Sequence, residues 1–163
     1  MRIGVIADTH IPRGSRRLPE ACVERLRQAD LILHAGDLTS SSFLAELRTL
    51  GPPVEAVRGN IDGADVAALL PETVVVEREG QRIGMIHVAG PRDGRERRLV
   101  GLFPGCAAVV YGHTHLPQVD RVGGVWILNP GSPTERRRAP ARTMIELSVR
   151  RGELVPELVE LGA

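Results

Sequence analysis

Short apolar runs bounded by turn residues recur along the chain, and runs of this kind are typical of buried β-strands. In the first half, segments with apolar residues at helical spacing separate them, as at Cys22, Val23 and Leu26. Ser40 to Ser42 are suited to cap such a helix. The pattern predicts strands at 2–7, 31–34 and 54–57, and helices at 19–28, 40–50 and 63–70.

The second half has a different pattern, because strand-like runs follow one another directly. Residues 73–79 and 81–87 flank Gly80, as the two strands of a hairpin do. Further strands are predicted at 107–111, 125–128, 143–149 and 154–161, and a helix at 94–103 with Leu99, Leu102 and Phe103 on its inner face. Alternating strands and helices followed by hairpins favour an α/β fold of two packed sheets with helices outside.

The length of 163 residues indicates a single domain covering residues 1–163. Of these residues, 42% are apolar and only 2% are aromatic. The core is therefore aliphatic. A net charge of +1 gives no electrostatic signature of a nucleic-acid or membrane partner. Cys22 and Cys106 are expected to be buried free thiols, as in a reducing compartment. No apolar run is long enough to span a bilayer or to act as a signal peptide, so we expect a cytoplasmic protein.

Polar motifs follow the ends of the predicted strands, where sites form in sheets of this kind. They are Asp8-Thr9-His10, Gly36-Asp37, Gly59-Asn60-Ile61-Asp62, His87, Gly112-His113-Thr114-His115 and Asn129-Pro130-Gly131-Ser132. Taken singly, each is no more than an ordinary strand end or turn. Taken together, they place four of the five histidines, two carboxylates and an asparagine at strand ends.

This combination predicts a metal site. In an extended backbone, residues i and i+2 point to the same side, so Asp8 and His10 can converge on one ion, and the same spacing recurs in the two imidazoles of His113 and His115. The Asp37 carboxylate has two oxygens and is suited to lie between two ions. Mixed imidazole, carboxylate and amide ligands suit Mn, Fe, Co, Ni or Zn, and no cysteine lies in the motifs.

The ordered set of motifs resembles that of the calcineurin-like metallophosphoesterases. The small size and the N-P-G-S segment narrow the resemblance to the short bacterial and archaeal phosphodiesterase branch, which shares its fold with the vacuolar-sorting retromer subunit. The resemblance spans Asp8 to Ser132 and implies a four-layer α/β/β/α sandwich of two mixed sheets flanked by helices. It also implies hydrolysis of P–O bonds by a hydroxide that bridges two divalent cations, with Mn favoured.

The resemblance also assigns roles to residues. One metal would be bound by Asp8, His10 and His115, the other by Asn60, His87 and His113, and both by Asp37. Asp37, Asn60 and His113 would act in catalysis by positioning the hydroxide and the phosphate.

Two features depart from the family pattern. Ile61 stands where larger relatives have a histidine that protonates the leaving group, so we expect diesters with good leaving groups to react best. The loop after His87 reads Val88-Ala89-Gly90 instead of the usual Gly-His.

Three alternatives remain at this point: a phosphomonoesterase or nucleotidase, a non-catalytic scaffold, and a mononuclear or purely structural metal site. Arg58 is a candidate to bind a substrate phosphate, while His34 and Asp62 are expected to support the metal ligands. The expected partner is a small phosphate ester. The sequence leaves open the natural substrate and whether the chain forms a homo-oligomer.

Overall fold

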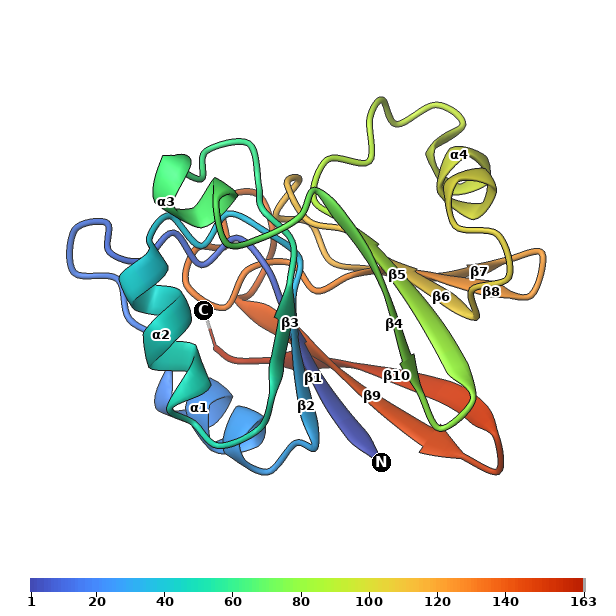
Figure 1. The fold of residues 1–163 in the computed structure, drawn as a ribbon, viewed down its shortest axis with the longest axis horizontal. Coiled ribbons are helices and arrows are strands. Elements are labelled where there is room, and N and C mark those ends of the chain that lie inside the picture. Colours follow the sequence, from blue (N-terminus) through green and yellow to red (C-terminus); the bar gives the residue numbers. More distant parts are fainter. Residues whose placement is uncertain (163) are drawn as a thin grey trace.

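The computed structural model describes residues 1–162, and two five-stranded mixed sheets lie face to face in it (Figure 1). The first sheet has the order β10-β9-β1-β2-β3 and the second has the order β4-β5-β6-β8-β7. The first contains β1 (Arg2–Ile6), β2 (Leu31–His34), β3 (Val54–Ala56), β9 (Thr143–Arg150) and β10 (Glu153–Glu160). The second contains β4 (Thr73–Arg78), β5 (Gln81–Ile86), β6 (Ala108–Val110), β7 (Gln118–Val122) and β8 (Val125–Asn129).

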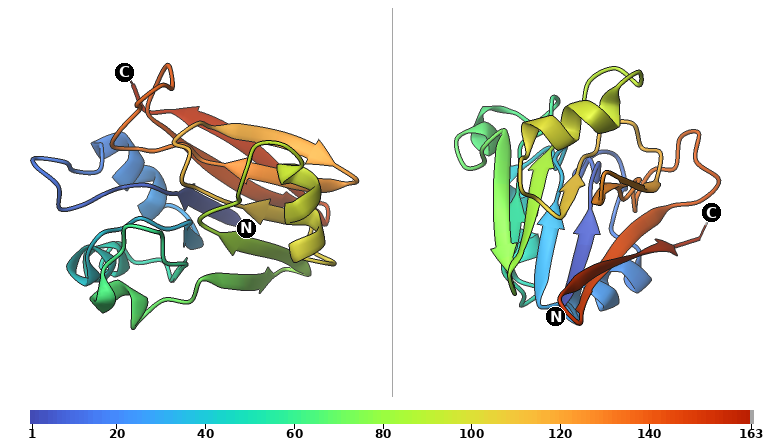
Figure 2. Two further views of the ribbon diagram at one scale, coloured as in Figure 1. Left: turned by 90° about the horizontal axis from the view of Figure 1, so that it is seen from above. Right: turned by 90° about the vertical axis from the view of Figure 1, so that its right-hand side faces the viewer.

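Helices cover both outer faces of this pair of sheets (Figure 2). Helices α1 (Glu20–Arg27) and α2 (Ser41–Arg48) pack on the first sheet, and α4 (Arg95–Leu102) packs on the second. The short helix α3 (Ala64–Ala67) follows β3. The predicted four-layer α/β/β/α sandwich is therefore confirmed.

Alternation along the strands explains the layers, because successive side chains of a strand point to opposite faces. In β1, Ile3 and Val5 are buried between the two sheets, whereas Ile6 packs with the residues of α1 and α2. Gly4 lies beneath α1, where an added Cβ would be 2.7 Å from Leu26 Cδ2. The absence of a side chain at this position thus lets the helix pack close to the strand.

Turn and cap residues act as the sequence predicts. The Ser40 hydroxyl caps α2 by accepting a hydrogen bond from the Phe43 N–H at 3.1 Å. Glu79 and Gly80 join β4 to β5 with positive φ at both residues, which is the conformation of a two-residue hairpin turn.

Two details differ from the sequence prediction. Strand β7 is absent from the prediction, because it is a largely exposed edge strand with a weak apolar signal. Leu102 is expected on the inner face of its helix but is 51% exposed. The helix ends there, and Phe103 has a non-helical backbone that turns its ring against Gly84, so Leu99 and Phe103 provide the packing.

Both cysteines are buried free thiols, as predicted, and burial raises the pKa of Cys22 to about 12. Within residues 1–162, no helix combines the length and the apolar character needed to cross a membrane.

Candidate metal centre

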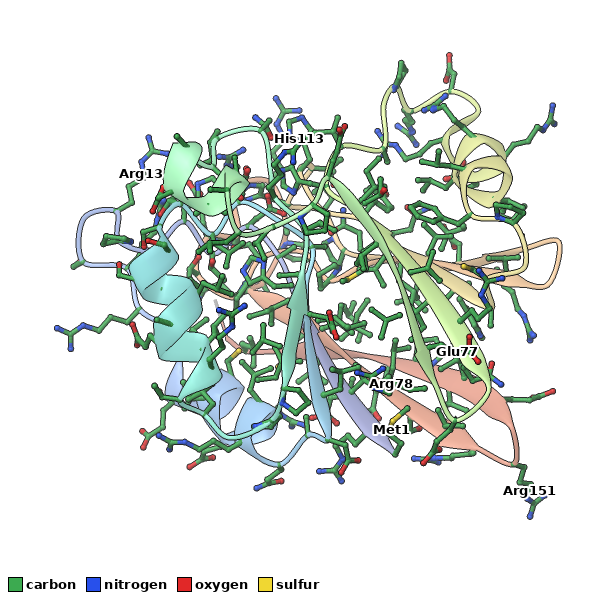
Figure 3. All side chains as sticks on the ribbon, in the orientation of Figure 1. Met1, Arg13, Glu77, Arg78, His113 and Arg151 are labelled. Atoms are coloured by element: carbon green, nitrogen blue, oxygen red, sulfur yellow. The ribbon has the colours of Figure 1, made fainter. Side chains whose placement is uncertain are left out.

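The carboxyl ends of strands from both sheets meet at one edge of the sandwich, and the predicted ligands lie there. Strands β1, β2 and β3 run parallel in the first sheet, as do β5, β6 and β8 in the second. In Figure 3, His113 marks this edge, at the opposite end of the sheets from Met1. The fold therefore brings together motifs that are more than 100 residues apart, as the His113 N–H bonded to the Asp8 carboxylate shows.

Asp8, His10 and His115 form the first group of the centre, and all three are buried. Each offers a ligand atom within 4.8 Å of the others. The Nε2 atoms of His115 and His10 lie 3.4 Å and 3.9 Å from Asp8 Oδ1. This is the group that the resemblance assigns to one metal.

Asp37 connects this group to the second. Its Oδ2 atom lies 3.4 Å from His10 Nε2 and 3.1 Å from His87 Nε2. Asn60 Oδ1 in turn lies 3.0 Å from His87 Nε2 and 2.9 Å from His113 Nδ1. The structure therefore brings all seven predicted ligands into one cluster, with Asp37 between the two groups. Asn60 and His113 are its exposed members.

Asp8 and His10 converge as predicted, but the backbone of five ligand residues is not extended, so the predicted reason for the convergence is wrong. Asp8, His10, Asp37, His113 and His115 all have positive φ, between 49° and 71°. Such conformations are uncommon outside glycine and collect at functional sites, where surrounding contacts hold them. Here, the Asp8 N–H donates to Gly36 O at 3.0 Å and the His10 N–H to Asp37 O at 3.1 Å. Tight turns, joined to one another by backbone hydrogen bonds, therefore orient these side chains towards the cluster.

Asp62 and His34 hold the Asp37 turn, as the sequence predicts. The Asp62 carboxylate accepts hydrogen bonds from the backbone N–H groups of Asp37, Thr39 and Gly59. His34 Nδ1 accepts from the Gly36 N–H, so its Nε2–H faces Thr9 Oγ1 at 3.0 Å. The complete burial of His34, aided by the nearby His87, lowers its pKa to about 3, which keeps the ring neutral in this role.

The Asn129–Ser132 segment supports the group formed by Asp8, His10 and His115. Asn129 Nδ2 donates to Gly112 O, and the Ser132 hydroxyl donates to Asp8 O at 2.8 Å. Sequence reasoning missed Glu135, whose carbonyl oxygen lies 3.4 Å from His115 Nδ1 and whose carboxylate pairs with Arg16 at 3.0 Å. Its only signal in the sequence is its place three residues after the Asn-Pro-Gly-Ser motif.

The arrangement of lone pairs fits a metal. His87 Nδ1 lies 2.7 Å from the carbonyl oxygen of Ala35 and donates its proton there, which leaves the Nε2 lone pair facing Asp37 and Asn60 oxygens. Lone pairs that face one another repel unless a proton or a metal cation lies between them. Within the described part of the chain, neither ring nitrogen of the buried His10 has a hydrogen-bond partner. The cluster therefore suits a divalent cation.

The electrostatics of the metal-free cluster agree with this conclusion. Burial alone would lower the pKa of His10, but Asp37 and Asp8 outweigh it and raise the pKa to about 9. The pKa of His87 is raised in the same way, against the effect of burial, by Asp37 and Asp8. Although burial opposes ionisation of Asp37, His10 and His87 hold its pKa well below the usual range. Protons thus occupy positions that a metal ion would take.

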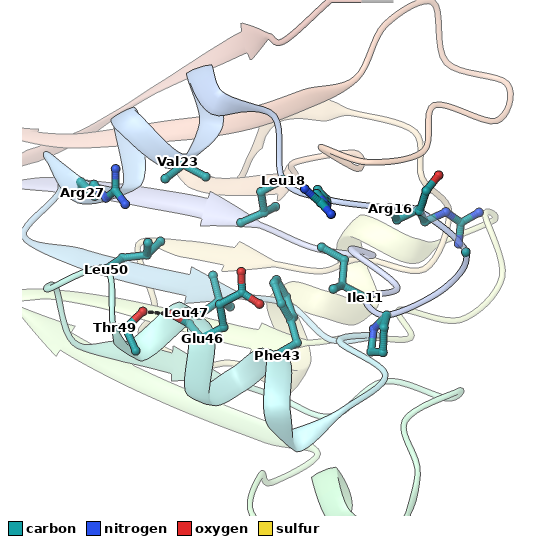
Figure 4. Close-up of a pocket in the computed structure, with 14 residues that line it drawn as sticks. Ile11, Arg16, Leu18, Val23, Arg27, Phe43, Glu46, Leu47, Thr49 and Leu50 are labelled. Carbon is teal, nitrogen blue, oxygen red and sulfur yellow. Dashed lines mark hydrogen bonds between the residues drawn. The ribbon is translucent and has the colours of Figure 1, made fainter.

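Two cavities lie near these residues. One of about 230 Å³ is lined by Asn60 and His87 together with Arg58, Glu72 and Val88, so Arg58 lies beside the cluster. Another of about 600 Å³ lies between α1, α2 and the 11–18 loop (Figure 4). It contains none of the seven predicted ligands, although its wall includes Ile11, the neighbour of His10. The smaller cavity is therefore the one that gives access to the cluster.

Comparison with known proteins gives consistent matches. A model of the calcineurin-like phosphoesterase superfamily domain matches residues 1–152. A protein of Methanothermobacter thermautotrophicus, named as a probable metallophosphoesterase, is 42% identical over 165 residues, covering 100% of this chain and 94% of the relative. A phosphodiesterase of Methanocaldococcus jannaschii is 23% identical over 150 residues, covering 80% of this chain and 83% of that protein.

Solved structures show the same fold. The crystal structure of wild-type Vps29 from Entamoeba histolytica, complexed with Zn²⁺, superposes with a TM-score of 0.76 at 26% identity. The superposition covers 99% of this chain and 100% of that protein. The four-layer architecture is therefore shared over the full described length.

Proposed function

The chain belongs to the calcineurin-like phosphoesterase superfamily, and on this premise we propose that it is a phosphodiesterase that works with two divalent cations. The observation that carries the proposal is the convergence of seven potential ligands, with Asp37 lying between two groups of imidazoles. The likeness to a phosphodiesterase of Methanocaldococcus jannaschii supports the reaction class.

Each cation would take one group of ligands. Asp8, His10 and His115 would hold one, Asn60, His87 and His113 would hold the other, and Asp37 lies between the two groups, in agreement with the distances in the cluster. When bound, the cations supply a Lewis acid that stabilises charge on phosphate oxygens and lowers the pKa of a water molecule. Mn²⁺ is the favoured ion, while Ni, Fe, Co and Zn suit the same ligands.

The exposed side of the cluster receives the substrate. Asn60 and His113 are exposed, whereas the other five residues are buried, so a phosphate approaches these two side chains. Arg58 lines the same cavity as Asn60, and among residues 1–162 its guanidinium contacts only Leu70 O at 3.4 Å and the exposed Glu72 at 3.6 Å. Such weak contacts leave its guanidinium able to turn towards a substrate phosphate.

Ile61 is the residue that favours diesters with good leaving groups as substrates. Its side chain is 44% exposed, and its N–H donates to Asp37 Oδ1 at 3.1 Å, which places it at the edge of the cluster. An aliphatic side chain has no proton to give to a leaving alkoxide. The reaction therefore depends on a leaving group that departs without protonation, such as an aryl oxide.

The test is a metal-reconstitution screen that reads bis(4-nitrophenyl) phosphate hydrolysis and metal content together for each divalent ion. We expect two ions per chain in the active protein, and an Asp37→Asn variant of the same size that loses both metal and activity. Faster hydrolysis of a simple alkyl monoester than of the aryl diester overturns the proposed preference. One ion per chain without activity overturns the dinuclear mechanism.

A non-catalytic metal-binding scaffold is the second candidate, favoured by the likeness to Zn²⁺-bound Vps29. It is the weaker one, because every predicted ligand position holds a side chain that can bind a metal. A metal-loaded protein that hydrolyses no ester in the screen would support the scaffold.

A further inference from the structure

An apolar groove extends from the candidate metal centre along helix α4. The 230 Å³ cavity that contains Asn60 and His87 shares Ile86 and Val88 with a second cavity of about 560 Å³. Pro91, Leu99, Gly101 and Leu102 line the far part of this second cavity. We call the second cavity the α4 groove.

The α4 groove exposes aliphatic surface that the fold does not need for its core. Val88 is 42% exposed and Leu102 is 51% exposed, although each adjoins well-buried residues. Exposed aliphatic side chains that gather beside a reactive centre mark a ligand site more often than isolated ones do. Leu102, which the sequence predicts on the inner face of its helix, instead lines the far end of the groove.

The α4 groove offers no free charge to a polyanionic ligand. Arg98 is the single charged residue among the described residues that line it. Its guanidinium donates to the carbonyl oxygens of Ala89, Pro91 and Asp93, at distances between 2.6 and 3.4 Å. With its donors occupied, Arg98 braces the loop that follows His87, and the groove surface stays apolar.

We propose that the substrate is a phosphodiester with one apolar ester group, an alkyl or aryl chain, which lies in the α4 groove while the phosphate lies at Asn60 and His113. This inference rests on the proposed function and names its substrate class. A second nucleotide phosphate would find in the groove only Arg98, whose N–H donors are already bonded to carbonyl oxygens, whereas a chain of methylene groups would be removed from water along Val88, Leu99 and Leu102.

The test uses alkyl 4-nitrophenyl phosphates from methyl to octyl with the metal-loaded full chain. The leaving group is the same throughout, so only the retained ester group changes. Full burial of a methylene corresponds to about a fourfold gain in binding, and a groove open on one side should give about twofold per methylene in kcat/KM.

Two variants change the groove without touching the predicted ligands. Gly101→Leu fills it, because an added Cβ at Gly101 has no neighbouring atom within 4 Å among the described residues. Leu102→Gln makes the wall polar. Both should abolish the gain with chain length and leave the methyl ester rate within about twofold of the wild type. Leu158→Gln is the matched control, since Leu158 is 40% exposed on β10 of the other sheet, and it should keep the gain.

Calorimetry with methyl octyl phosphate and dimethyl phosphate measures the affinity of the groove for an alkyl chain independently of turnover. The octyl ester should bind at least about tenfold more tightly to the wild type, and the two should bind equally to Gly101→Leu. A flat chain-length series in the wild type, or a gain that survives in both groove variants, overturns the inference and leaves the proposed function standing. If no diester is hydrolysed, the proposed function fails, and equal binding of the two esters then rejects the groove as well.

Discussion

The position most sensitive to a single added carbon is Gly59, which lies against the Asp37 turn. A Cβ at this residue would be 2.0 Å from Asp37 Oδ1 and 2.3 Å from the Asp37 backbone nitrogen. Ordinary contact begins at 3.4 Å, so in Gly59→Ala the Asp37 carboxylate must move by about 1.4 Å and the turn itself by about 1.1 Å.

The turn has little freedom to make this shift. Asp62 accepts from the N–H groups of both Asp37 and Gly59, and the Ile61 N–H donates to Asp37 Oδ1. Metal–ligand distances tolerate about 0.2 Å, so a displacement several times larger removes Asp37 from its place between the two groups. We expect loss of at least one ion per chain and a fall in diesterase kcat of about 100-fold or more. Overpacking adds a loss of stability of about 1–3 kcal/mol, or about 3–10 °C in Tm.

Alanine variants of two other glycines serve as controls that distinguish loss of the metal site from loss of stability. In Gly84→Ala, the added Cβ would lie 2.5 Å from the Phe103 ring and against none of the predicted ligands, so stability falls by a similar amount while metal content is kept. In Gly63→Ala, the nearest atom to the added Cβ is Asp65 Oδ1 at 3.2 Å, and metal content should again be unchanged.

The assay is elemental analysis after dialysis against metal-free buffer, combined with thermal unfolding of loaded and metal-free protein. The reasoning is refuted if Gly59→Ala retains as much metal as the wild type and as Gly84→Ala.

Three further outcomes are expected from the same contacts. Asp62→Ala removes the acceptor of three backbone N–H groups and should weaken metal retention, but less than Asp37→Ala, which removes a ligand; equal losses by elemental analysis would overturn the assigned roles. Chelation should lower Tm by about 8 °C or more if the ions bind with Kd about 1,000-fold below their concentration, and an unchanged Tm would contradict binding to the folded state. Because the pKa of His10 is raised to about 9 from 6.5, its proton stabilises the metal-free fold below pH 6.5, and this contribution is lost as the pH rises through 9. A metal must displace this proton, so its affinity, measured by calorimetry, should rise about tenfold from pH 7 to 8 and level off above pH 9, and a constant affinity would contradict the coupling.

The sequence by itself determined the elements and the candidate residues. Apolar runs predicted nine of the ten strands close to their observed bounds, and the motifs at their ends named the seven residues that the structure brings together. The reason is that strand burial and turn chemistry are local properties, and that parallel strands bring the residues at their carboxyl ends to one edge of a sheet. The family could be recognised for the same reason, since the order of the motifs is a property of the chain.

Only the tertiary structure decided how these residues meet. The positive φ values at Asp8 and His113 depend on hydrogen-bond partners from other loops, which are Gly36 O for Asp8 and the Asp8 carboxylate for His113, and no local pattern contains these partners. The roles of Glu135 and Asp62 likewise depend on contacts between segments far apart in the chain. Strand β7 and the exposed Leu102 escaped prediction because each has its place set by neighbours in the second sheet, and Leu102 lines the α4 groove beside the metal centre.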